Sequence, residues 1–150
     1  MSLKAIEFVH LRNYSQYSLS RGALRISELI DFCKNQNIPA TAITDFDNLF
    51  GSLEFCLETV KNGIQPIIGT NIFLRDKKFK NGYLLLLCKN EIGYKNLVKL
   101  ISHSYLNNLE INSPYILIED LKKYSKGLIC LGGGKFGIIT KNLNESHILS

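Results

Sequence analysis

The sequence predicts an α/β fold with a mainly parallel sheet, and three observations support this class. Short apolar runs rich in β-branched residues alternate with stretches in which apolar residues recur every three or four positions. Gly, Pro and Asn punctuate the junctions between these runs. The run 84–88 is apolar throughout, as is typical of a central parallel strand with both faces buried. Alternation of this kind is characteristic of α/β folds.

The first half of the chain is predicted to contain three strands and two helices. The strands are expected at residues 5–11, 40–44 and 66–74. A helix is predicted over residues 26–35, because its apolar positions have helical spacing: Ile26, Leu29, Ile30 and Cys33. A second helix is predicted to begin near Leu49, capped by Asp47 or Asn48, and to end at Asn62 and Gly63. Its expected inner face consists of Leu49, Leu53, Cys56, Leu57 and Val60.

The second half of the chain continues the alternation. A strand over 83–88 precedes a helix that Asn90 caps. The apolar side of that helix is expected to consist of Tyr94, Leu97, Val98, Ile101 and Tyr105. A short helix near 118–124, a strand over 127–131 and part of one more helix complete the expected elements. The five strands are compatible with an open sheet and equally with the first part of a barrel that continues past Ser150.

Composition indicates a single globular domain over residues 1–150. The chain is 45% hydrophobic and 21% charged, enough for one ordinary core. The amino terminus lacks the features of a signal peptide, and no apolar run is long enough for a membrane span, so we expect a cytoplasmic protein without membrane contact. The four cysteines have neither metal-site nor disulfide spacing, so we expect buried, reduced thiols.

The net charge of +5 permits contact with nucleic acid. The basic residues are spread along the chain, with local clusters at 75–80 and 122–126. No basic stripe with interleaved aromatic residues is present. A solvated surface is therefore favoured over a phosphate-binding track.

Polar residues at the ends of the predicted strands are the candidates for a functional cleft. The strand 40–44 leads directly into Asp45 and Phe46, at the position where α/β folds place active-site residues. The strand-end polar residues are His10, Arg12, Tyr14, Asp45, Asn71 and Tyr83. Only His10 and Asp45 among them are strong metal ligands, and a catalytic ion needs three or more. Ser15 and Ser18 lack the surroundings of a catalytic nucleophile.

Five segments carry a resemblance to a known family: FVHLRNYSQYSLSRGALRI, ITDFDNLFGSLEF, GIQPIIGTNIFL, EIGYKNLVKLIS and GLICLGGGKFG. Together they resemble the amino-terminal polymerase and histidinol phosphatase (PHP) domain of bacterial DNA polymerase III alpha subunits, from about residue 8 to residue 137. The resemblance implies a distorted β/α barrel. Because that domain is longer than 150 residues, it also implies an incomplete barrel, truncated on its carboxyl-terminal side.

In active members of the family, the motifs HLHxHSxYSLLDG and TDHGNLFG supply ligands to a metal cluster that hydrolyses phosphate esters. Aligned on these motifs, six ligand positions hold other residues in this chain: Arg12, Tyr14, Arg21, Phe46, Asn71 and Tyr83. His10 and Asp45 remain. With these two residues, the six substituted positions form what we call the vestigial cleft, for which we predict no catalytic and no metal-binding residue. Arginine cannot ligate a cation, and we expect Arg12 or Arg21 to form an ion pair with Asp45 or Asp47.

The resemblance also implies a function. We expect a catalytically inactive structural and interaction module of a DNA polymerase III alpha subunit, whose full-length chain would carry out DNA-directed DNA synthesis with Mg²⁺. This segment itself would need no cofactor. Its implied partners are the remainder of the alpha chain, a proofreading exonuclease subunit, and DNA through the full-length enzyme. The alternatives are a metal-dependent phosphoesterase with an unrecognised ligand set and a free-standing nucleic-acid-binding module.

Overall fold

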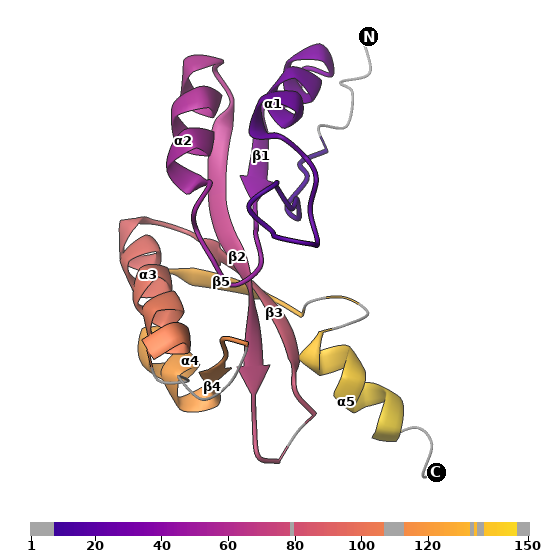
Figure 1. The fold of residues 1–150 in the computed structure, drawn as a ribbon, viewed down its shortest axis with the longest axis vertical. Helices are drawn as coiled ribbons and strands as arrows, with labels where there is room; N and C mark the ends of the chain where they lie inside the picture. Colours follow the sequence, from indigo (N-terminus) through magenta and orange to yellow (C-terminus); the bar gives the residue numbers. More distant parts are fainter. Residues whose placement is uncertain (1–7, 79, 107–112, 133, 135–136, 147–150) are drawn as a thin grey trace, which may run out of the picture.

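The computed structural model describes residues 8–78, 80–106, 113–132, 134 and 137–146. Its elements are α1 (Ile26–Asn35), β1 (Ala40–Ile43), α2 (Ser52–Lys61), β2 (Gln65–Arg75), β3 (Gly82–Cys88), α3 (Glu91–Leu106), β4 (Ile116–Leu117), α4 (Ile118–Tyr124), β5 (Leu128–Leu131) and α5 (Ile138–Ser146). Figure 1 shows α1 and α2 beside the first part of the long strand β2, and α3 and α4 beside its second part. The α/β class is confirmed.

The sheet is mixed, so the expectation of a mainly parallel sheet was wrong. The strand order is β1-β2-β3-β5, with β4 pairing with β2. β1 and β4 run parallel to β2, whereas β3 runs antiparallel to both β2 and β5. Only residues 76–81 separate β2 from β3, which suits a hairpin, since a parallel connection needs a crossover of about a dozen residues or more. This hairpin reverses the direction of the most apolar strand. The order β1-β2-β3-β5 is that of an open sheet in the described part of the chain.

The expected first strand over residues 5–11 was wrong for its described part, residues 8–11, and residues 5–7 lie outside the described residues. The segment nevertheless runs alongside β1. Ala42 donates its N–H to the carbonyl of His10 at 3.0 Å, and Thr44 donates to that of Asn13 at 2.9 Å. The segment thus advances three residues while β1 advances two. A regular parallel ladder needs equal steps, so no strand forms.

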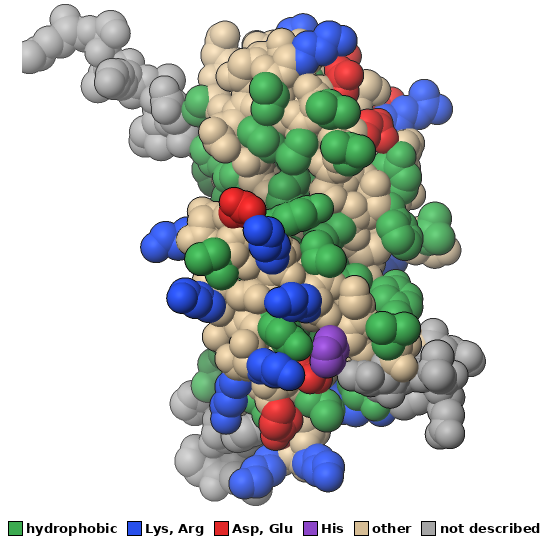
Figure 2. Space-filling view, turned by 90° about the vertical axis from the view of Figure 1, so that its left-hand side faces the viewer, with side chains coloured by type: hydrophobic (Ala, Val, Ile, Leu, Met, Phe, Trp, Pro, Cys, Tyr) green, Lys and Arg blue, Asp and Glu red, His purple; other side chains and the backbone are tan. Residues whose placement is uncertain are grey.

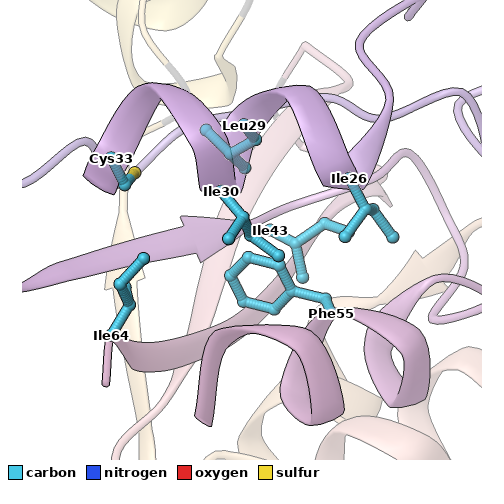
Figure 3. Close-up of a cluster of buried hydrophobic side chains, with 7 residues drawn as sticks. All are labelled: Ile26, Leu29, Ile30, Cys33, Ile43, Phe55 and Ile64. Atoms are coloured by element: carbon cyan, nitrogen blue, oxygen red, sulfur yellow. The ribbon is translucent and has the colours of Figure 1, made fainter. Parts of the chain in front are cut away.

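Each half of the molecule has its own hydrophobic cluster. Figure 3 shows the first cluster, in which side chains of α1, β1 and α2 converge with Ile64, which precedes β2: Ile26, Leu29, Ile30, Cys33, Ile43, Phe55 and Ile64. The second cluster joins β2, β3, β4 and α3: Ile72, Leu74, Leu84, Leu86, Leu97, Leu100 and Ile116. Because β2 passes from one cluster to the other, it is the element that fixes the two halves relative to each other.

The expected inner face of the second helix was wrong, and that of the third was correct only for Leu97 and Ile101. In α2 the buried residues are Ser52, Phe55 and Thr59. Three residues of the expected face are instead well exposed: Leu53, Leu57 and Val60. In α3 the buried residues are Gly93, Leu97, Leu100 and Ser104, while most of the expected face is exposed: Tyr94, Val98 and Tyr105. Apolar residues lie on more than one side of each helix, so periodicity alone does not select the buried side.

The local end signals were partly correct. The expected cap by Asn90 is confirmed, because its Oδ1 accepts the N–H of Gly93 at 3.0 Å. The expected cap of α2 by Asp47 or Asn48 was wrong, since the N-cap position of that helix is Gly51.

All four cysteines are free, but the expectation that they are buried holds for Cys33 alone. In the described part of the chain, none of the helices combines the length and apolar character needed to cross a membrane.

Candidate functional site

The residues of the vestigial cleft, apart from His10, gather where the chain leaves β1. Beyond that strand, Phe46 pairs with Asn71 of β2 in a parallel bridge. Asn71 donates its backbone N–H to the carbonyl of Asp45 at 3.0 Å, and its own carbonyl accepts the N–H of Asp47 at 2.9 Å. Tyr83 enters from the adjacent strand β3. The backbone therefore brings these side chains together beyond the end of β1. The expectation that Asn71 stands at a strand end was wrong, because it lies within β2 and pairs with Leu85 of β3.

Asp45 is only 2% exposed and serves as an anchor for the amino-terminal segment. Its Oδ1 accepts the N–H of Ser15 at 2.7 Å and the hydroxyl of Ser18 at 2.6 Å. Its Oδ2 accepts the hydroxyl of Ser15 at 2.7 Å. Both carboxylate oxygens are thus engaged by donors of the chain itself. We call this arrangement of Asp45, Ser15 and Ser18 the aspartate clamp.

Three of the substituted positions carry aromatic rings that pack on one another, and a fourth carries an arginine that joins two of these rings. The ring centroids of Tyr14 and Phe46 are 4.6 Å apart, and those of Phe46 and Tyr83 are 5.1 Å apart with their planes close to perpendicular. The guanidinium of Arg21 lies 4.4 Å from the Phe46 ring centroid and 5.2 Å from that of Tyr83, within the range of cation–π attraction. Its Nη1 also donates to the Tyr83 hydroxyl at 2.7 Å.

Arg12 contacts the same aromatic rings through Tyr14, whereas Arg21 contacts them through Phe46 and Tyr83. Its Nε donates to the hydroxyl of Tyr14, and its guanidinium carbon lies 5.6 Å from the centre of the Tyr14 ring. We call the five residues Arg12, Tyr14, Arg21, Phe46 and Tyr83 the aromatic–arginine cluster. All five are positions that the resemblance aligns with metal ligands of active family members, an assignment that stays a prediction.

The expected ion pair was wrong. Among the residues described, neither Arg12 nor Arg21 forms a salt bridge within 4.0 Å with Asp45 or Asp47. The aspartate clamp explains the first case, because the Asp45 carboxylate is buried and already saturated by donors. Burying a guanidinium beside it would carry a desolvation cost, whereas the exposed Arg21 stacks on half-buried rings and keeps its contact with water.

Asp47 is the electrostatically unusual group of the site. It is buried, adopts a positive φ of 56°, and accepts the N–H of Phe73 at 3.1 Å. Burial raises the pKa of Asp47 to about 6, against the lowering effects of that hydrogen bond and of the positive charge on Arg21. Asp47 is therefore largely ionised at neutral pH, at a cost in stability.

His10 lies apart from the aromatic–arginine cluster. Its exposed ring lies edge-on to Phe8, with centroids 4.7 Å apart, and 6.3 Å from Phe32 of α1. The sequence grouped His10 with the cleft, but its ring contacts in the structure are with Phe8 and Phe32. Of the two residues that could ligate a metal, His10 thus packs beside α1, and the carboxylate of Asp45 accepts the hydrogen bonds of the aspartate clamp.

The side chains gathered beyond the end of β1 do not fit a metal cluster. Asn71 donates its Nδ2 to the carbonyl of Thr44 at 3.1 Å, and its Oδ1 is the one buried side-chain polar atom without a partner in the described part of the chain. One buried amide oxygen cannot by itself hold a divalent cation, and a guanidinium group cannot ligate one. No group of three or more His, Cys, Asp or Glu side chains with metal-binding geometry occurs among the described residues.

Sequence reasoning missed two functional parts of this site. Ser15 and Ser18 were considered as nucleophiles, whereas both belong to the aspartate clamp. Asp47 was considered as a helix cap, whereas it accepts a backbone hydrogen bond from Phe73 of β2. The spacing Ser-x-x-Ser is a usable signal for a turn that presents two hydroxyls together, but its carboxylate partner lies some 30 residues away in sequence.

Arg21→Ala is expected to lower the free energy of unfolding by about 1 kcal/mol at pH 7.5, because it removes two cation–π contacts and one hydrogen bond. The loss is expected to be smaller at pH 4, where Asp47, with a pKa of about 6, is protonated and no longer attracted to Arg21. Urea denaturation at both pH values measures it. Arg25→Ala, at an exposed arginine of the same segment, is the control. Equal losses for both variants at both pH values would contradict the role of Arg21.

Comparison with known proteins gives one family and several relatives. The model of the family described as PHP domain matches residues 10–148. Three relatives are the DNA polymerase III subunit alpha of Borreliella burgdorferi, 44% identical over 89% of this chain, of Rickettsia bellii, 39% identical over 91%, and of Vibrio cholerae, 37% identical over 94%. This chain spans 12% of the length of each.

Two solved structures share the fold. One, from Bifidobacterium adolescentis, is described as a metal-dependent phosphoesterase; it matches with a TM-score of 0.50 and 15% identity over 64% of this chain and 32% of its own. The other is an amidohydrolase from Chromobacterium violaceum with bound sulfate and no metal, with a TM-score of 0.50 and 22% identity over 68% of this chain and 34% of its own. At these identities the similarity concerns the fold alone.

Proposed function

Because this chain belongs to the PHP domain family, we propose that it is a non-catalytic PHP domain of a bacterial DNA polymerase III alpha subunit. The observation that carries the proposal is the aromatic–arginine cluster. Arg21 bridges Phe46, which follows β1, and Tyr83 of β3, while Tyr14 stacks on Phe46 from the amino-terminal segment. In this proposal, stacking and hydrogen bonds replace the metal cluster as the link between these three elements.

The wider role is inferred from the relatives, all of which carry the name DNA polymerase III subunit alpha. Since this chain spans 12% of their length, polymerisation would be carried by other parts of the full-length protein, which would use Mg²⁺ there. The proposed partners are the remainder of the alpha chain, a proofreading exonuclease subunit, and DNA bound through the full-length enzyme. The segment itself would require no cofactor.

The size of the native polypeptide tests the assignment to a polymerase. An antibody against residues 8–78 would be used on an extract of the source organism. A band above roughly 100 kDa, the scale of a multi-domain chain, is expected. A band near 17.0 kDa, the mass of the 150 residues, would show that the segment acts alone and would overturn the polymerase assignment.

The absence of phosphoesterase activity is a second expected result. The chain, incubated with Mn²⁺ or Zn²⁺ and bis(p-nitrophenyl) phosphate, is expected to release nitrophenol no faster than the metal in buffer, because the donor set of the site does not fit a metal cluster. Elemental analysis of the purified protein measures bound metal directly. Hydrolysis that follows bound metal and is lost with a chelator would favour the phosphoesterase alternative instead.

A further inference from the structure

Two basic clusters that are far apart in the sequence form the walls of one groove. β4 pairs with the end of β2, with Leu74 opposite Ile116 and Arg75 opposite Leu117. This pairing places the start of α4 beside the turn that follows β2. The resulting groove of about 570 Å³ is lined by Arg75, Asp76, Lys77, Lys78, Leu117, Ile118, Glu119 and Lys122. We call these eight residues the basic groove.

Positive charge predominates in the basic groove. Four lining residues are cationic and two are acidic. Of the two acids, Asp76 accepts the backbone N–H of Lys78 through its Oδ1 at 2.7 Å, so this oxygen faces its own turn. Lys77 and Lys78 on one wall and Lys122 on the other are all exposed. Their ammonium groups can therefore approach an anion from both sides of the groove.

Arg75 is held in a defined orientation at the groove. Its guanidinium carbon lies 4.2 Å from the centre of the Tyr115 ring. Cation–π stacking uses the face of the guanidinium and leaves its N–H groups, which lie in the plane of the group, available to an acceptor. Phosphate oxygens are acceptors of this kind, and arginine can bind two of them at once.

Further basic side chains lie on α3 and α4. In the face that Figure 2 shows, Lys and Arg side chains gather over the lower half, while hydrophobic side chains predominate in the upper half. Lys123 of α4 and Lys99 of α3 both lie near the Tyr124 ring, at 5.2 and 5.8 Å from its centre. The charge is thus extended rather than focused on one point, which suits a long polyanion better than a single free phosphate.

We propose that the basic groove binds the phosphate backbone of double-stranded DNA. With a volume of about 570 Å³, the groove would receive backbone phosphates between its two basic walls, with the duplex lying across it. Its lining is mostly charged, whereas a protein partner is typically bound through an apolar interface core. Its described lining residues include no aromatic side chain, and single-strand sites typically rely on aromatic stacking platforms. The proposal rests on charge and shape and does not depend on the polymerase assignment.

Salt-dependent binding tests the proposal. The affinity of the chain for a fluorescein-labelled duplex is measured by fluorescence anisotropy between 50 and 200 mM KCl, a range chosen because phosphate contacts are strongly salt-dependent there. The double variant Lys77→Gln with Lys122→Gln neutralises one lysine on each wall. The matched control, Lys34→Gln with Lys61→Gln, removes the same charge from exposed positions on α1 and α2.

The groove variant is expected to bind about tenfold more weakly at 100 mM KCl, and its slope of log affinity against log salt should fall by about 1–2, since each phosphate contact contributes about 0.9. The control variant is expected to retain the slope of the wild-type chain. Equal effects of the two variants, or no salt-dependent binding of duplex at 50 mM KCl, would overturn the proposal. Tighter binding to single-stranded DNA of the same length, or to phosphatidylserine vesicles, would overturn it in favour of those ligands. The polymerase assignment is tested separately by the size of the native polypeptide, so failure of the DNA-binding proposal would leave that assignment unchanged.

Discussion

Asp45→Ala is expected to lower the free energy of unfolding by about 3–5 kcal/mol, a large part of the total for a small domain. The carboxylate is 2% exposed and accepts three hydrogen bonds, from the N–H and hydroxyl of Ser15 and the hydroxyl of Ser18. Alanine would leave these donors buried without an acceptor and would release the amino-terminal segment from β1. Urea denaturation at pH 7.5 measures the change.

Two variants make the Asp45 result interpretable. Asp45→Asn keeps the shape and one acceptor oxygen, so an intermediate loss of about 1–2 kcal/mol is expected. Asp31→Ala removes an exposed carboxylate from α1 and should change stability by less than about 0.5 kcal/mol. If Asp45→Ala proved no more harmful than Asp31→Ala, the aspartate clamp would contribute nothing to the fold.

Asp47→Asn is expected to raise the free energy of unfolding by about 2 kcal/mol at pH 7.5. The pKa of Asp47 is raised from 3.8 to about 6 in the folded chain, so folding favours its protonated form. Its contribution to stability is therefore fully present below about pH 3.8 and is lost as the pH rises through about 6. Asparagine stays neutral, can still accept the N–H of Phe73, and tolerates the positive φ of 56°.

The pH dependence distinguishes this effect from a general gain in stability. The advantage of Asp47→Asn over the wild-type chain should be largest above pH 7 and should vanish near pH 3.8, as measured by urea denaturation across that range. Asp31→Asn, at an exposed site, serves as the control and should show no such trend. An advantage that is constant with pH would mean that the charge on Asp47 is not its cause.

Local sequence signals were sufficient for most of the elements. The helices over residues 26–35 and 118–124 have the bounds that were predicted, because each has a clear beginning and end within its own sequence. The two-residue strand β4 was missed, since it is too short to show periodicity and exists only through its pairing with β2. The direction of β3 was also missed, although the short connection 76–81 implied a hairpin.

The buried sides of α2 and α3 show what periodicity cannot supply. In α2, Phe55 is buried while Leu53 and Leu57 are well exposed, although all three are equally apolar in sequence. The choice is made by α1 and β1, whose side chains surround Phe55 in the first cluster. Burial is a property of the assembled layers, so a helix with apolar residues on several sides can be oriented only once its neighbours are placed.

The sequence by itself determined the α/β class and the family resemblance, and it predicted the positions at which metal ligands have been replaced, because motifs and their spacing are local properties. Tertiary structure alone decided what the replacements do. It stacked Arg21 on Phe46 and Tyr83, saturated Asp45 with Ser15 and Ser18, and joined two distant basic clusters through the pairing of β4 with β2. Each of these contacts joins residues far apart in the chain, and its energy depends on burial and geometry that exist only in the folded molecule.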